Sequence, residues 1–91
     1  MPQDPRHELE ATVARIWQDV LDVPSVGTGD HFFKLGGHSL QAMTVIVRVR
    51  NEIGGRVGLA DILRAPVLGE FVELVSTRTN HSSGVAVEEA P

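Results

Sequence analysis

Apolar residues recur at intervals of three and four in separate segments of this chain, and this spacing constrains the fold more than any other feature. The clearest case is residues 42–53, where five apolar side chains fall on one face of a helix. No segment alternates apolar and polar residues as a half-buried strand does. The spacing therefore predicts an all-α fold.

Proline and glycine divide the chain into helical segments. Asp4-Pro5 is typical of a helix start, Pro24 is expected to end that helix, and Gly54-Gly55 to end the next. We expect helices at about residues 5–22, 39–53 and 67–77, with one or two helical turns within 58–64. A chain of 91 residues provides for one domain. The prediction is a small four-helix bundle of three main helices plus one short helix.

The connection between the first two helices, residues 23–38, is unusually long. Structureless loops of more than about 12–15 residues are uncommon in compact domains and are usually functional or disordered. This loop carries apolar residues that we expect to hold it against the core, and these are Val26, Phe32, Phe33 and Leu35. Gly36-Gly37 permits a sharp reversal with positive φ. The loop thus delivers the hydroxyl of Ser39 at the start of the most apolar helix.

The two ends of the chain lack the helical pattern. We expect residues 1–4 to be an N-terminal extension, 5–77 to form the domain, and the polar residues 78–91 to be a flexible linker or tail. No apolar run approaches the roughly 20 residues of a membrane span, and the first residues do not resemble a signal peptide. The expected location is the cytoplasm, with no membrane partner and a monomeric domain.

Composition excludes several kinds of site. The chain has no cysteine, so a disulfide framework and a thiolate metal site are excluded, and any thiol chemistry requires a thiol from elsewhere. The four histidines lie at positions 7, 31, 38 and 81, without ligand spacing, so we expect no metal site. A formal net charge of -4 argues against a nucleic-acid partner. Residues 39–58 are nevertheless locally basic, with three arginines and one glutamate.

The hydroxyl of Ser39 has three possible roles. It could be an N-cap that only satisfies backbone N–H groups, although no capping box follows from it because Ala42 stands where Glu or Gln is needed. It could be a nucleophile activated by His38, but neighbouring residues at a helix start do not face each other. It could be a modification site, because a helix N-terminus favours a phosphate.

The eleven residues from Asp30 to Leu40, Asp-His-Phe-Phe-Lys-Leu-Gly-Gly-His-Ser-Leu, resemble the core motif of peptidyl carrier (thiolation) domains of nonribosomal peptide synthetases. The resemblance covers about residues 8–75. Leu63 and Val67 depart from it, since the family often has phenylalanine and usually threonine there. His38 matches the peptidyl subgroup, where fatty-acid and aryl carriers usually have aspartate.

The resemblance implies a carrier without catalysis of its own. It implies that a phosphopantetheinyl transferase uses coenzyme A and Mg²⁺ to attach 4'-phosphopantetheine to Ser39. The arm would then hold an aminoacyl or peptidyl thioester for adenylation, condensation and thioesterase or tailoring domains. The alternatives are an acyl or aryl carrier of a polyketide or siderophore-type pathway, and a non-carrier helical interaction domain.

Docking on these partners is expected to depend on apolar contact more than on charge, because the first two-thirds of the second helix contains no acid. The candidate contact residues are Phe33, His38, Leu40, Met43, Val47, Leu59 and Ile62.

Overall fold

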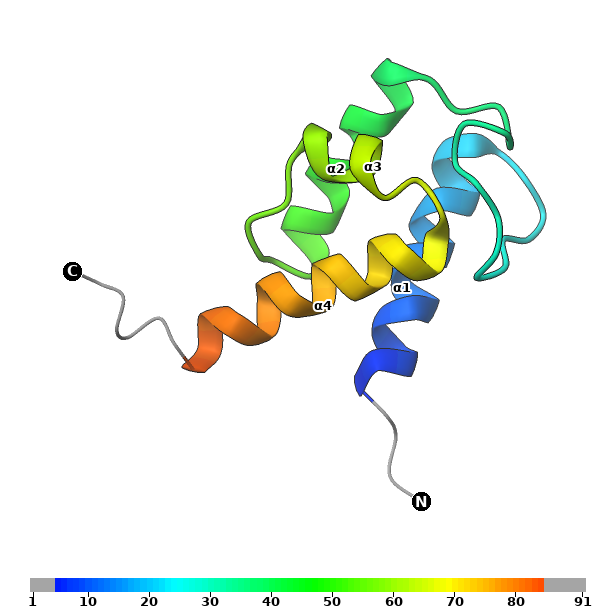
Figure 1. Cartoon of the computed structure of the whole chain (residues 1–91). Coiled ribbons are helices and arrows are strands. Elements are labelled where there is room, and N and C mark those ends of the chain that lie inside the picture. The colour runs from blue at the N-terminus through cyan, green and yellow to red at the C-terminus, as the bar shows by residue number, and fades with distance from the viewer. Residues whose placement is uncertain (1–4, 85–91) are drawn as a thin grey trace.

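The computed structural model describes residues 5–84, which form four helices (Figure 1). These are α1 (Pro5–Leu21), α2 (Ser39–Glu52), α3 (Leu59–Arg64) and α4 (Leu68–Gly84). Helix α1 packs against both α2 and α4, and the short α3 contacts α2 and α4. The prediction of an all-α bundle with three main helices, one short helix and a long first connection is confirmed.

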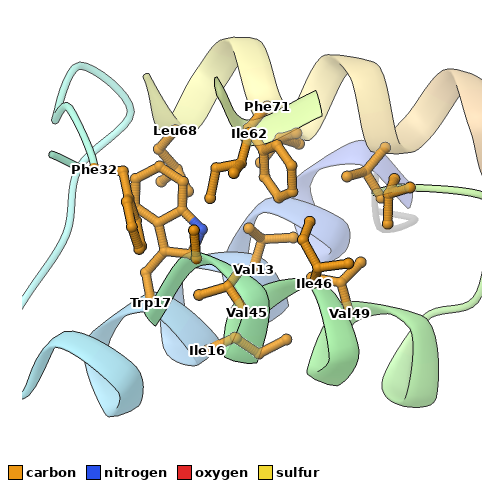
Figure 2. Packing of buried hydrophobic residues seen from close by; sticks show 14 of the residues in the cluster. Val13, Ile16, Trp17, Phe32, Val45, Ile46, Val49, Ile62, Leu68 and Phe71 are labelled. Carbon is orange, nitrogen blue, oxygen red and sulfur yellow. The ribbon is translucent and has the colours of Figure 1, made fainter. Parts of the chain in front are cut away.

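The core is centred on three aromatic rings from different parts of the chain (Figure 2). Trp17 of α1 meets Phe32 of the long loop edge-on at 5.1 Å between ring centroids, and Phe71 of α4 lies 6.1 Å from it. The predicted apolar face of α2 belongs to the same core, and its buried residues are Ala42, Val45, Ile46 and Val49. Burial of large apolar side chains is the main stabilising contribution in a domain of this size.

The end of α1 differs in mechanism from the prediction. Asp22 adopts a left-handed conformation with φ of 58°, and the N–H of Val23 reaches back to the carbonyl of Gln18 at 3.2 Å. This is the usual closure of a helix by a residue with positive φ. The helix therefore ends at Leu21, three residues before Pro24, which lies beyond the turn.

Helix α4 extends beyond the end that the apolar spacing predicted. The expected end was residue 77, and the helix continues to Gly84. Arg78 explains part of the difference, because its side chain binds the carboxylate of Asp61 and the carbonyl of Arg56. The first residues of the predicted 78–91 tail are thus helical, whereas residues 1–4 and 85–91 lie outside the described residues.

The long loop is tied to the start of α4 by backbone hydrogen bonds. An isolated antiparallel bridge joins His31 to Val67. Within it, Phe32 N–H donates to the carbonyl of Pro66 at 2.8 Å, and Leu68 N–H donates to the carbonyl of Asp30 at 3.0 Å.

No helix within residues 5–84 is long and apolar enough to cross a membrane.

Candidate functional site

The end of the long loop is shaped by Phe32 and two glycines. Phe32 is fully buried, and the predicted anchors Val26, Phe33 and Leu35 pack against the core as partly buried side chains. Gly36 has a φ of 106°, which L side chains rarely adopt. Gly37 has another requirement, because a Cβ atom there would lie 2.3 to 2.8 Å from three ring atoms of Phe32.

The reversal at these glycines sets the first residue of α2. His38 is the N-cap, with extended backbone at φ -145° and ψ -177°, and Ser39 is the first helical residue. Gln41 accepts a hydrogen bond from His38 N–H at 3.1 Å. The interpretation of Ser39 as the N-cap is therefore wrong. A glutamine does fold back on the cap, as in a capping box, but the cap is His38, one residue before Ser39.

The Ser39 hydroxyl is consequently exposed and available. Within the described chain, no hydrogen bond joins it to another group, and none links it to His38 as a nucleophile to its base. The first backbone bond of α2 runs from Ala42 N–H to the His38 carbonyl at 2.9 Å. The N–H groups of Ser39 and Leu40 precede it and find no backbone acceptor in residues 5–84. A phosphate on Ser39 would fit this positive end of the helix.

Leu40, the neighbour of Ser39, is the first of several large apolar residues that are exposed on α2 and α3. Four large apolar residues are exposed in the described chain, and these are Leu40 (72%), Met43 (42%), Val47 (48%) and Leu63 (53%). The first three follow one another at helical spacing on α2, and Leu63 lies on the neighbouring α3. We call these four residues the apolar surface. The exposure of Leu40, Met43 and Val47 agrees with their selection as contact candidates but does not test it.

The remaining contact candidates lie in different environments. Ile62 is fully buried in the core (Figure 2), so its assignment as a partner contact is wrong. Leu63, next to it, is the exposed residue that sequence analysis missed, because a six-residue helix has too few turns for spacing to define a face. Leu59 is partly buried against the core. Phe33 is also partly buried, with its ring 5.2 Å from that of Phe32. His38 is exposed beside Ser39.

The arginines of α2 are not equivalent. Arg48 pairs with Glu52 at 2.9 Å and with Asp19 at 3.2 Å, and Arg15 pairs with the same glutamate at 3.0 Å. The hydrogen bond to Glu52, followed by that to Asp19, raises the pKa of Arg48. The hydrogen bonds from Arg48 and Arg15 lower the pKa of Glu52. The charge of Arg48 is thus neutralised locally, and the basic character predicted for this helix is left to Arg50, which is exposed and forms no ion pair with any described residue.

Comparison with known proteins gives a consistent result. The family model described as "Phosphopantetheine attachment site" matches residues 11–75. Bacitracin synthase 3 of Bacillus licheniformis is 42% identical over 89 residues, which cover 93% of this chain and 1% of that protein. The chain thus spans a very small part of this curated relative.

Two solved structures are similar in both fold and sequence. The solution structure of PCP, a prototype for the peptidyl carrier domains of modular peptide synthetases, is 34% identical with a TM-score of 0.70, covering 85% of this chain and 97% of that one. The structure of the phosphopantetheine transferase Sfp in complex with coenzyme A and a peptidyl carrier protein gives 34% identity and a TM-score of 0.74, covering 85% of this chain and 96% of that one.

Proposed function

This chain belongs to the family of phosphopantetheine attachment domains, and on that basis we propose that it carries 4'-phosphopantetheine on Ser39 as the peptidyl carrier of a nonribosomal peptide synthetase. The resemblance predicted from residues 30–40 is confirmed by the family match and by the similarity to peptidyl carrier domains. The attachment residue itself is a proposal, and the environment of Ser39 carries it. Its hydroxyl is exposed, free of hydrogen bonds within the described chain, and placed at the first position of α2.

The residues around Ser39 suit a carrier. The bond to Gln41 fixes the backbone of His38, the close approach of Phe32 to Gly37 fixes the turn, and the free N–H groups at the start of α2 favour a negative phosphodiester. The bound group supplies the thiol that this cysteine-free chain lacks. Ser39 Oγ forms no hydrogen bond to a base in the described chain, and we propose that it serves as an acceptor for another enzyme.

The partners follow from the same proposal. A phosphopantetheinyl transferase would load Ser39, and adenylation, condensation and thioesterase or tailoring domains would then exchange the thioester. We propose that they contact the apolar surface together with His38, and that Phe33 and Leu59 support that contact from partly buried positions. Tethering to a short arm raises the effective concentration of the intermediate at each partner. We also propose that the carrier unit begins at about residue 5 and is monomeric.

Intact-mass measurement tests the proposed function. The purified chain is incubated with coenzyme A, Mg²⁺ and a promiscuous phosphopantetheinyl transferase. We expect one added phosphopantetheine group per chain, and none in Ser39→Ala. Ser25→Ala serves as the matched control, because Ser25 is an exposed serine in the loop that leads to Ser39 and should leave loading intact. A folded wild-type chain that takes up no group would contradict the proposal and favour a helical interaction domain.

A further inference from the structure

The guanidinium group of Arg78 joins three segments of the molecule. Its Nη2 donates to Asp61 Oδ1 at 2.9 Å, and its Nη1 donates to Asp61 Oδ2 at 3.2 Å and to the carbonyl of Arg56 at 2.7 Å. Arg56 lies in the connection between α2 and α3, Asp61 in α3, and Arg78 in α4. Two parallel bonds between a guanidinium and a carboxylate combine strength with a defined geometry. We call this set of contacts the Arg78 clamp.

Asp61 depends on this contact. It is the one charged residue that is buried within residues 7–78, where burial is described, with 7% of its surface exposed. Its Oδ2 also accepts the N–H of Gly58 at 2.7 Å, so the same carboxylate fixes the start of α3. A buried carboxylate that loses its counter-charge is strongly destabilising. Removing the guanidinium should therefore displace Asp61, and α3 with it, toward solvent.

Helix α3 depends on its neighbours for its position. It contains six residues, fewer than an isolated helix needs to be stable in water. Ile62 anchors it in the core, while Leu63 faces outward as its contribution to the apolar surface. The other three residues of that surface belong to α2. The relative placement of α2 and α3 consequently determines whether the four side chains form one continuous contact area.

We propose that Arg78 is a positioning residue for partner docking: the Arg78 clamp fixes α3 so that Leu63 completes the apolar surface beside Ser39. This inference rests on the proposed function, since the docking in question is that of the enzyme that loads Ser39. It also implies that the functional unit extends past residue 77, since Arg78 belongs to it. In this proposal Arg78 affects docking through α3 and does not touch the partner itself.

Steady-state loading by the transferase tests the clamp in the full chain. The variants are Arg78→Ala, Arg78→Lys and Asp61→Asn, and the amide oxygen introduced by Asp61→Asn can still accept the Gly58 N–H although the negative charge is lost. Arg15→Ala is the matched control, because it removes an ion-paired arginine from α1. We expect Arg78→Ala to raise the KM for the carrier about threefold or more while kcat stays within about twofold, as an interaction of ordinary coupling energy would.

Three further readouts distinguish positioning from general stabilisation. Amide hydrogen exchange of residues 59–64 should accelerate in Arg78→Ala relative to that of the α1 and α2 core. Arg78→Lys should raise the KM less than Arg78→Ala does, since lysine keeps the positive charge but cannot form the two parallel bonds to the carboxylate. The Asp61→Asn and Arg78→Ala effects on KM should not add in the double variant.

An unchanged KM in folded Arg78→Ala would overturn the proposal, as would exchange that accelerates equally in all four helices. If Arg78→Ala does not fold, Arg78→Lys and Asp61→Asn decide by the same two measurements. If the wild type itself is not loaded, the proposed function fails, and hydrogen exchange in α3 still decides whether the clamp positions that helix.

Discussion

Phe32 holds Gly37 in two ways. Its carbonyl accepts the N–H of Gly37 at 3.1 Å, and its buried ring occupies the space that a side chain at position 37 would need. The aromatic core of the bundle is thereby connected to a backbone position only two residues from Ser39. The contact between Phe32 and Gly37 therefore contributes both to the packing of the core and to the position of Ser39.

Gly37→Ala is expected to disturb both. A Cβ atom at 2.3 Å from a buried ring forces the loop or the ring to move, and overpacking of this kind costs about 1–3 kcal/mol. Urea unfolding should show this loss, and loading of Ser39 should slow. Gly29→Ala is the matched control, because nothing lies within 4 Å of its Cβ position, and it should change neither quantity. Equal effects of the two substitutions would contradict the role of the Phe32 contact.

Ser39→Ala should abolish loading and leave stability almost unchanged. A serine N-cap replaced by alanine costs about 1 kcal/mol, but Ser39 lies one residue inside the cap and its hydroxyl binds nothing in the described chain. We therefore expect a change in unfolding free energy of about 0.5 kcal/mol or less. Gln41→Ala should cost more, about 0.5–1.5 kcal/mol, because it removes the acceptor for His38 N–H. A larger loss of stability for Ser39→Ala than for Gln41→Ala would indicate that Ser39 is the N-cap.

Ile62→Ala and Leu63→Ala should have opposite consequences although the residues are adjacent. Ile62 is fully buried, and its truncation should cost about 2–5 kcal/mol in urea unfolding. Leu63 is half exposed, and its truncation should cost about 0.5 kcal/mol or less while raising the KM of the loading enzyme. Leu40→Ala should behave like Leu63→Ala. Normal loading of both folded surface variants would remove the apolar surface from the docking proposal.

The acid dependence of stability should contain a contribution from Glu52. Its hydrogen bonds to Arg48 and Arg15 lower its pKa in the folded protein. Such a carboxyl stabilises the fold above its unfolded-state pKa, and this contribution is lost as the pH falls through its lower folded-state pKa. Glu52→Gln should therefore lose less stability than the wild type over that range, measured by urea unfolding at successive pH values.

The size of this effect should be small and sensitive to salt, since the arginine and carboxylate groups are solvent-accessible. Glu70→Gln provides the control, because Glu70 is exposed on α4 and has no ion pair within the described chain, so this variant should parallel the wild type. If Glu52→Gln also parallels the wild type, the ion pairs contribute nothing measurable.

Much of the fold could be predicted because helical spacing marks buried faces directly. The intervals between the apolar residues of 42–53 placed one face of this helix in the core, and Ala42, Val45, Ile46 and Val49 are buried there. The loop anchors could be predicted for a related reason. Large apolar side chains in a polar, glycine-rich loop avoid water mainly by packing against the core. Phe32 is the best example, as it is fully buried.

Three features could not be obtained in this way, each for its own reason. The choice of His38 over Ser39 as the N-cap is a difference of one residue, and it depends on the path that Gly36 and the Phe32 contact impose on the backbone. The burial of Ile62 depends on how α3 lies on its neighbours. The role of Arg78 depends on a carboxylate 17 residues earlier in the chain, and local spacing carries no information about such a pair.

The bonds between the long loop and α4 have a consequence for which changes the loop can accept. The first N–H groups of α4 lack acceptors within the helix, and those of Leu68 and Gly69 donate instead to the loop carbonyls of Asp30 and Thr28, at 3.0 and 2.9 Å. Because main-chain atoms supply these acceptors, exchanging the side chain of Thr28 should matter little. An insertion or deletion between Thr28 and Ser39 would shift the whole path, so the length of this segment is constrained more strictly than its composition.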